Sequence, residues 1–164
     1  MSCHVTAGPK TGYRRCVGML LLNGDGRIFV GQRKDAGDKG GWQMPQGGIE
    51  KGEQPEDAAF REMEEEVGTR LGEILSASRV WRSYDLPAEI ASRMWKGAYR
   101  GQTQKWVAIR FTGADKDIDI HTEHAEFSRW RWVEPDEIVD LIVPFKRDVY
   151  LSVFDEFRHL WAGS

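Results

Sequence analysis

Three glutamates on one predicted helix are the residues in this sequence best suited to carry chemistry. Pro55, followed by acidic residues, predicts the first turn of a helix, and Gly68 predicts its end. At about 100° per residue, Glu62, Glu65 and Glu66 fall within one sector about 100° wide, and like charges at this spacing repel. The alternative is a solvated acidic face. However, carboxylates beside flexible glycines suit hard cations such as magnesium, which also accept phosphate oxygens.

The stretch around these glutamates resembles the Nudix box. It reads GGIEKGEQPEDAAFREMEEEVGT and begins at Gly47. The positions that match the box are Gly47, Glu53, Arg61, Glu62, Met63, Glu65, Glu66 and Gly68. Thr69 departs from the pattern, which has an aliphatic residue there. The resemblance implies a loop, helix and loop that bind a divalent metal, Mg²⁺ or alternatively Mn²⁺, through the three glutamates and hydrolyse a diphosphate linkage.

Segments outside the box are similar to one Nudix subgroup. They are WQMPQGGI, GQTQKW, EFSRWRWV and PFKRDVY, and with the box they occur in order between Tyr13 and Phe157. The subgroup comprises the bacterial RNA pyrophosphohydrolases and the dinucleoside polyphosphate hydrolases of bacteria and plants. The resemblance therefore implies removal of pyrophosphate from the 5′-triphosphate end of RNA, promoting RNA decay. Its alternative is cleavage of diadenosine tetraphosphate.

The same resemblance assigns roles to residues outside the box. Glu126 matches an additional metal-binding or catalytic glutamate. Arg14 and Lys105 match positions that contact phosphate, and Arg33 and Phe145 match a pair that holds a nucleobase. Without the resemblance, each of the charged residues would be read as a solvated surface group and Phe145 as core. Lys146 and Arg147 are further basic candidates for binding phosphates, because they lie at the start of the terminal helix.

Other conspicuous residues are predicted to be structural. Arg61 is expected to pair with Glu53 and to orient the metal-binding glutamates. His121 and His124 have a spacing that could ligate metal, but the surrounding carboxylates make nitrogen ligands unnecessary, so we expect surface residues. The tryptophans in strand-like contexts are expected in the core first and as stacking platforms second: Trp42, Trp106, Trp130 and Trp132.

Strands and helices must bring these residues together, and hydrophobic patterning predicts where they lie. Apolar runs or alternation predict strands over 13–22, 27–32, 42–45, 73–81, 104–111 and 129–133. Helices are predicted from Pro55 to Gly68, from Pro135 to Ile142 and over 145–161, with a helical or looped insertion at 87–94. Hairpins mixed with helices, rather than regular alternation, predict a mixed sheet in an α/β/α sandwich, the Nudix fold.

Length and composition limit the remaining possibilities. A chain of 164 residues, 40% hydrophobic and 30% charged, predicts one soluble globular domain. We expect a flexible N-terminal arm over residues 1–12 and the Nudix hydrolase domain over residues 13–164. A net charge of −3 argues against nucleic-acid binding through bulk charge, which leaves a local basic rim. Two cysteines without metal or disulfide spacing, and no signal or membrane segment, predict a cytoplasmic protein.

Several alternatives stay open from the sequence. Glu66 and Glu126 are both candidates for the general base. A Nudix-fold module that binds nucleotides without catalysis is a rival of a different class, although the intact glutamates argue against it. Sanitation of oxidised nucleoside triphosphates shares the box but does not predict the QMPQGG and FKRDVY segments.

Overall fold

The computed structural model describes residues 3–36 and 40–161, and their strands form a single mixed sheet. The strands of these residues are β1 (His4–Thr6), β2 (Arg14–Leu22), β3 (Ile28–Arg33), β4 (Trp42–Gln43), β5 (Gln46–Gly48), β6 (Gly72–Ala77), β7 (Trp81–Asp85), β8 (Gly101–Phe111) and β9 (Phe127–Val133). The α-helices are α1 (Pro55–Val67), α2 (Ala88–Ala91), α3 (Pro135–Leu141) and α4 (Arg147–Phe157). Short 3-10 turns are η1 (Lys34–Ala36), η2 (Met94–Gly97), η3 (Asp115–Asp117), η4 (Pro144–Lys146) and η5 (Arg158–Leu160).

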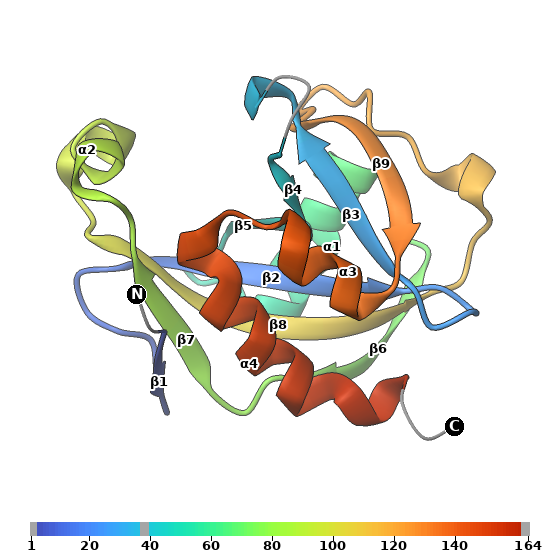
Figure 1. The fold of residues 1–164 in the computed structure, drawn as a ribbon, viewed down its shortest axis with the longest axis horizontal. Coiled ribbons are helices and arrows are strands. Elements are labelled where there is room, and N and C mark those ends of the chain that lie inside the picture. The colour runs from blue at the N-terminus through green and yellow to red at the C-terminus, as the bar shows by residue number, and fades with distance from the viewer. Residues whose placement is uncertain (1–2, 37–39, 162–164) are drawn as a thin grey trace.

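The sheet is organised around β2 and β8, which run parallel through its middle (Figure 1). The principal strand order is β1-β7-β8-β2-β3-β4, and β5, β6 and β9 pair with β2, β8 and β3 respectively. Every pair other than β2 with β8 is antiparallel. Gly18 of β2 lets the two long strands fit together, because a Cβ there would lie 2.5 Å from the ring of Trp106.

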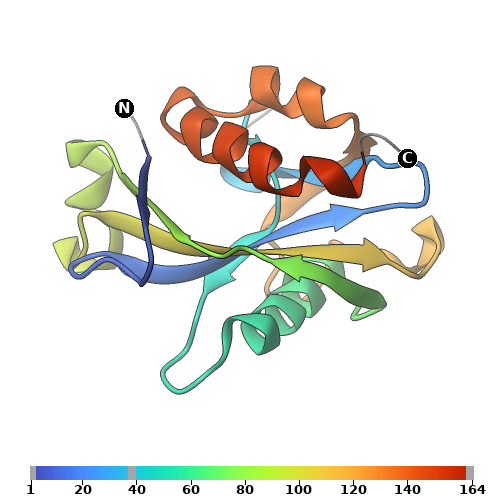
Figure 2. The same cartoon turned by 90° about the horizontal axis from the view of Figure 1, so that it is seen from below.

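Helices cover both faces of the sheet (Figure 2). On one face α1 packs over a core that contains Val17, Met19 and Val107, and on the other α3 and α4 pack over a core that contains Leu20, Trp106 and Tyr150. Alternation along β2 and β8 supplies both cores, since successive side chains point to opposite faces. The predicted α/β/α sandwich with a mixed sheet is confirmed.

Two predictions of local structure differ from the fold. The single strand predicted over 73–81 is two strands, because the Ser78 hydroxyl accepts a hydrogen bond from Trp106 N (3.0 Å) and donates one to Val80 O (2.8 Å), turning the chain between β6 and β7. Within the predicted arm at 1–12, His4–Thr6 form β1 and pair with β7, so this part is held on the sheet edge. Residues 1–2 lie outside the described residues.

The described part of the chain offers no helix long and apolar enough to cross a membrane. Cys3 and Cys16 are both free thiols. Burial raises the pKa of the Cys16 thiol to about 11, so this group stays protonated at neutral pH.

Candidate active site

A pocket of about 450 Å³ opens beside the N-terminal ends of the two parallel strands β2 and β8. Its walls come from both halves of the chain: α1 and β5 on one side, the α2 and η2 segment on another, and η4 on a third. Ligand sites commonly occupy cavities of about 300–1,000 Å³. The size and the convergence of charged side chains make this pocket the candidate active site.

One end of the pocket, here called the acidic end, is lined by Glu62, Glu65, Glu66 and Glu126. The first three come from α1, whose opposite side is buried in the core through Ala58, Ala59, Met63 and Val67. The helix begins at Pro55 and ends where Gly68, at φ 81°, adopts the left-handed conformation, as the sequence predicted. The fourth carboxylate, Glu126, precedes β9. The structure therefore brings together all four acidic residues selected from the sequence.

Burial makes two of these carboxylates hard to ionise. Glu66 is only 3% exposed, and its Oε2 accepts a hydrogen bond from Gln46 N at 3.1 Å. Loss of solvent, followed by repulsion from Glu62 and Glu126, raises the pKa of Glu66 well above its ordinary value. Burial likewise raises the pKa of Glu62 to about 7, although Arg61 opposes this shift. The acidic end thus concentrates negative charge that a cation would stabilise.

Arg61 holds the loop before α1 and the acidic end in one network. Its Nε and Nη2 donate to the two Glu53 oxygens at 2.9 Å each, and its Nη2 donates to Gly48 O at 2.8 Å. Its Nη1 contacts Glu62 Oε1 at 2.8 Å and Glu65 Oε2 at 3.4 Å. Bonding to Arg61 lowers the pKa of Glu53 to about 2. The expected pair of Arg61 and Glu53 is present, and it fixes the arginine beside the metal-binding candidates.

Two successive glycines in β5 allow opposite charges to approach from the two sides of the strand. A Cβ at Gly47 would lie 1.9 Å from the Glu62 carboxyl carbon, and a Cβ at Gly48 would lie 2.4 Å from Arg14 Nη2. No side chain could occupy either position without displacing these groups. The box glycine at 47 therefore has a steric role, which is close approach of Glu62 to the backbone.

Thr69, the one departure from the box pattern, is accommodated without an unpaired hydroxyl. Its side chain is buried, and its Oγ1 accepts a hydrogen bond from Leu71 N at 3.0 Å. The polar residue therefore costs little where an aliphatic residue would sit.

The donor chemistry of the acidic end fits a hard divalent cation. Four carboxylates line the pocket beside the Gly47 and Gly48 backbone, and repulsion from Glu62 and Glu126 adds to burial in raising the pKa of Glu66. Within the described residues, no three carboxylate, imidazole or thiol groups converge closely enough to enclose an ion. Two of the four carboxylates, Glu62 and Glu65, are instead bonded to the Arg61 guanidinium. Glu62, Glu65, Glu66 and Glu126 are the groups that could hold a metal.

Cationic groups line the pocket next to the acidic end. Arg14, Arg33 and Lys146 all reach it. Lys146 is only 6% exposed, and its Nζ donates to Gln43 Oε1 at 3.2 Å. Burial, followed by repulsion from Arg33, lowers the pKa of Lys146 to about 8. An anionic ligand would stabilise the charged form of this ammonium group and gain a strong contact.

The pair predicted to hold a nucleobase lies in the same pocket. The Arg33 guanidinium is oriented by Asp35, with Nε to Oδ1 at 3.0 Å and Nη2 to Oδ2 at 2.8 Å. The Phe145 ring lies 5.9 Å from the Tyr84 ring, centroid to centroid, and is half-buried. A planar cation and an aromatic face are both available to a flat ring.

Two of the basic residues selected to bind phosphate, Lys105 and the exposed Arg147, do not line the pocket. Lys105 lies on β8, and strand alternation points it to the face opposite Gln102 and Gln104. Its Nζ lies 6.0 Å from the centre of the Trp81 ring. Its predicted contact with phosphate therefore has no support from position, in contrast to that of Arg14.

Sequence reasoning missed a glutamine network at the base of the pocket. Gln102 Oε1 accepts hydrogen bonds from Tyr84 Oη (3.1 Å), Gln46 Nε2 (3.3 Å) and Gln104 Nε2 (2.9 Å). Gln104 also donates to Gln46 Oε1 at 3.0 Å. The sequence does contain these glutamines, within the segments QMPQGG and GQTQKW. Their positions in the sequence do not reveal that they touch, because the contacts form only when β5, β7 and β8 assemble.

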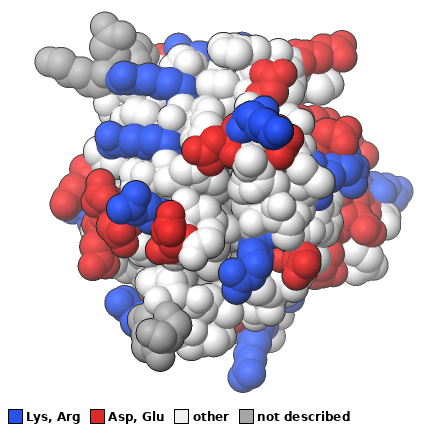
Figure 3. All heavy atoms as spheres, turned by 90° about the vertical axis from the view of Figure 1, so that its right-hand side faces the viewer, with Lys and Arg blue, Asp and Glu red and all other residues white. Residues whose placement is uncertain are grey.

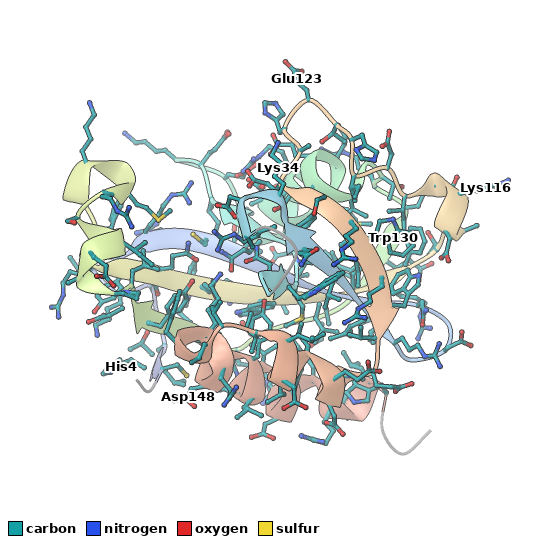
Figure 4. The ribbon with its side chains drawn as sticks, turned by 45° about the horizontal axis from the view of Figure 1, so that its top comes forward. His4, Lys34, Lys116, Glu123, Trp130 and Asp148 are labelled. Carbon is teal, nitrogen blue, oxygen red and sulfur yellow. The ribbon has the colours of Figure 1, made fainter. Side chains whose placement is uncertain are left out.

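The loop before β9 forms part of the rim. His124 lines the pocket while remaining exposed, so the predicted surface residue is also a rim residue. Lys34 and Glu123 both lie at this end of the molecule, and Glu123 points outward (Figure 4). Lys34 N donates to Glu126 O at 3.0 Å, which ties the rim to the turn after β3.

The tryptophans pack mainly as predicted. Trp106 is fully buried and Trp42 nearly so. Trp130 lies on β9 (Figure 4), where its ring stacks on Phe29 with centroids 5.5 Å apart, and the half-buried Trp132 packs on the same ring at 6.0 Å.

The α/β/α sandwich with a glutamate-rich helix at its pocket defines a family, and the chain belongs to it: the NUDIX domain matches residues 12–153. Nudix hydrolases generally use divalent metal ions. Among curated relatives, a protein of Roseobacter denitrificans named RNA pyrophosphohydrolase is 55% identical, covering 89% of this chain and 92% of its own length. A protein of Rickettsia typhi with the same name is 51% identical, covering 90% and 91%.

Solved structures share the fold at lower identity. The Escherichia coli dihydroneopterin triphosphate pyrophosphohydrolase superposes with a TM-score of 0.62 and 19% identity, covering 87% of this chain and 96% of its own. The Caenorhabditis elegans Ap4A hydrolase binary complex gives a TM-score of 0.60 and 18% identity, covering 88% and 98%. These similarities establish the fold.

Proposed function

We propose that this protein removes pyrophosphate from the 5′-triphosphate end of RNA by metal-dependent hydrolysis, and thereby promotes RNA decay. The observation that carries the proposal is one pocket that combines four carboxylates, the cations Arg14 and Lys146, and Arg33 and Phe145, the pair proposed to hold a base. Relatives more than 50% identical over about nine-tenths of the chain bear the name RNA pyrophosphohydrolase.

Water is the nucleophile, and the bridge between the α and β phosphates breaks to give pyrophosphate and a 5′-monophosphate. Glu62, Glu65, Glu66 and Glu126 would hold the metal, with Mg²⁺ proposed and Mn²⁺ as the alternative. When bound, the metal neutralises phosphate charge and makes water more acidic. Glu66 or Glu126 accepts the proton from water.

The cationic residues position the substrate for this reaction. Arg14 lies against Gly48, beside the acidic end, and would contact the polyphosphate there. A guanidinium can form two parallel hydrogen bonds to phosphate, which fixes orientation as well as charge. Arg33 and Phe145 would hold a base in the same pocket, which leaves the polyphosphate to reach Arg14 and the acidic end.

RNA binding in this proposal is concentrated in the pocket. On the face shown in Figure 3, the described Lys and Arg side chains are intermixed with Asp and Glu side chains. A protein with a net charge of −3 has little attraction for a polyanion as a whole. Recognition therefore depends on the 5′ end. We also propose a cytoplasmic setting, with which the free thiols of Cys3 and Cys16 are consistent.

Cleavage of diadenosine tetraphosphate is the second candidate, favoured by apolar surface in the pocket beyond the Arg33 and Phe145 pair. The deciding experiment gives the purified protein triphosphorylated RNA and diadenosine tetraphosphate at equal concentration with magnesium and compares kcat/KM. We expect RNA to be the faster substrate, with pyrophosphate or successive phosphates released. Faster cleavage of the dinucleotide would reverse the order, and cleavage of neither would contradict both.

A further inference from the structure

The side of the pocket formed by the α2 and η2 segment is apolar. Leu86 directly after β7, Ile90 in α2 and Met94 at the start of η2 all line it, so three successive parts of this segment face the cavity. Met94 is 39% exposed, although nothing about a short surface helix requires a large apolar residue there. We call these three residues the apolar wall.

The apolar wall is fixed to the sheet. Leu86 is buried in the core, Leu86 N donates to Arg100 O at 3.0 Å, and Ile90 packs partly against the same core. Asp85, at the end of β7, bonds to the Tyr13 hydroxyl and lies 3.5 Å from Arg100 Nη2. These contacts hold the two ends of the segment on the sheet and anchor the Leu86 and Ile90 part of the wall.

The wall continues an apolar surface that begins at the proposed base-holding pair. Tyr84 and Leu86 are two residues apart at the end of β7, and both line the pocket beside Phe145. The surface therefore runs from Phe145 across Tyr84 and Leu86 to Ile90 and Met94. A base held by Arg33 and Phe145 would use the first part of this surface and would leave the wall to a second flat, apolar group.

We propose that Leu86, Ile90 and Met94 form a subsite for a second nucleobase of the substrate. This inference rests on the proposed function, since it assumes a substrate that carries a polyphosphate and two bases. Side chains without hydrogen-bonding groups would pack on the face of any base, so this subsite adds affinity with little preference for sequence. The second base comes from the next nucleotide of an RNA chain or from the second nucleoside of a dinucleoside polyphosphate.

The test variant is Met94→Ser, because Met94 is the most exposed member of the wall. Met94→Leu keeps the apolar contact and should retain activity. The matched control is Leu151→Ser, since Leu151 is 42% exposed on α4 and does not line the pocket. On a triphosphorylated dinucleotide with magnesium, we expect Met94→Ser to lower kcat/KM by about fivefold, a typical effect of a changed apolar pocket contact.

Substrates that lack one base identify what the wall contacts. Met94→Ser and Phe145→Ala are each measured on triphosphorylated dinucleotides without the first base and without the second base. A variant should match wild type on the substrate that lacks the base its residue contacts. If Met94 and Phe145 contact different bases, the two variants therefore match wild type on different substrates. If both variants lose their effects on the same substrate, they contact one base and the second subsite is rejected.

Diadenosine tetraphosphate distinguishes the two sources of the base. A loss on the RNA dinucleotide assigns the wall to the second nucleotide of RNA, and a loss confined to diadenosine tetraphosphate assigns it to the second adenosine. Unchanged rates of Met94→Ser on both substrates, while wild type cleaves them, overturn the subsite and leave the proposed function standing. Wild-type protein that cleaves neither substrate contradicts the proposed function, and the subsite falls with it.

Discussion

The two ends of the pocket are built in different ways. Three of the four carboxylates at the acidic end come from one helix, within five consecutive residues. The substrate-binding side, which adjoins the acidic end where Arg33 pairs with Phe127 next to Glu126, gathers Arg33, Tyr84, Met94 and Phe145 from four separate elements. Chemistry that depends on one helix is fixed by local geometry, whereas substrate binding depends on how the whole sheet is assembled. We therefore expect changes at the acidic end to affect every substrate and changes on the substrate-binding side to affect particular ones.

The largest effect is expected at the acidic end. Glu65→Gln or Glu66→Gln should lower turnover at least about a hundredfold on every substrate, since changes that merely surround metal ligands cost about 10 to 100-fold. Steady-state assays at saturating magnesium measure the loss, and circular dichroism checks the fold. Glu64→Gln is the control, because Glu64 is exposed on the same helix and pairs with Arg70. Near-native turnover of Glu65→Gln and Glu66→Gln would show that the carboxylates are not metal ligands.

A steric change should impair the acidic end without removing any charge. Gly47→Ala places a methyl group where the Glu62 carboxylate lies, so we expect kcat to fall by roughly 10 to 100-fold on all substrates. Gly24→Ala is the matched control, since a Cβ there meets nothing within 4 Å. Magnesium titration should show weaker metal dependence of activity in Gly47→Ala alone. Equal rates in both variants would contradict the close approach of Glu62 to the backbone.

Arg14→Met and Lys105→Met separate a residue inside the pocket from one outside it. A charge-assisted contact contributes about 1.5–3 kcal/mol, so Arg14→Met should reduce kcat/KM at least tenfold. Lys105→Met should change it less, because its ammonium group lies by Trp81. Both variants are assayed on RNA and on diadenosine tetraphosphate. If kcat/KM fell only on diadenosine tetraphosphate, that compound would be the preferred substrate. If Arg14→Met and Lys105→Met lost equal activity, Lys105 would contact the substrate after all.

Phe145→Ala tests the substrate-binding side. Stacking of a base on an aromatic ring contributes about 1–3 kcal/mol, so kcat/KM on RNA should fall roughly tenfold or more. Hydrolysis of inorganic triphosphate, which has no base, should fall less. Equal losses on the two substrates would indicate instead that Phe145 supports the packing of η4.

The smallest effect concerns stability and has a defined sign. The folded-state pKa of Glu66 is raised, so the folded protein binds more protons than the unfolded chain above pH 4.5, the ordinary value, and its free energy of unfolding falls as pH rises. Glu66→Gln removes this loss, so it should unfold at higher urea concentration than wild type near pH 7 in metal-free buffer. The difference should disappear near pH 4.5. Lower stability of the variant at neutral pH would contradict the raised pKa.

The sequence predicts the parts of the molecule that short-range physics determines. The helix Pro55–Val67 follows from proline, glycine and the 3.6-residue period, β2 follows from a continuous apolar run, and β8 follows from apolar alternation. Between β6 and β7 the apolar pattern continues, and only the contact of Ser78 with Trp106 breaks the strand. No local pattern could place that contact.

The candidate site divides in the same way. The spacing of Glu62, Glu65 and Glu66 places them together before any tertiary structure is known. Lys146 was one of several basic candidates, and its burial beside Gln43 depends on η4 meeting β4. Lys105 was selected by resemblance, yet it lies further along β8 beside Trp81 and does not line the pocket. Which part of a strand borders the cavity depends on its neighbours, and the residues alone do not specify it.

The parallel pairing of β2 with β8 also determines when the site can exist during synthesis. β2 and α1 leave the ribosome early, but β2 lacks its parallel neighbour until Gly101–Phe111 has been made, and Phe145 follows later still. Pairing across such a separation is slow, because the long loop must close before the contacts stabilise it. A nascent chain therefore carries its carboxylate helix well before it can hold a substrate, and cleavage of RNA has to wait until β8 and Phe145 have been made.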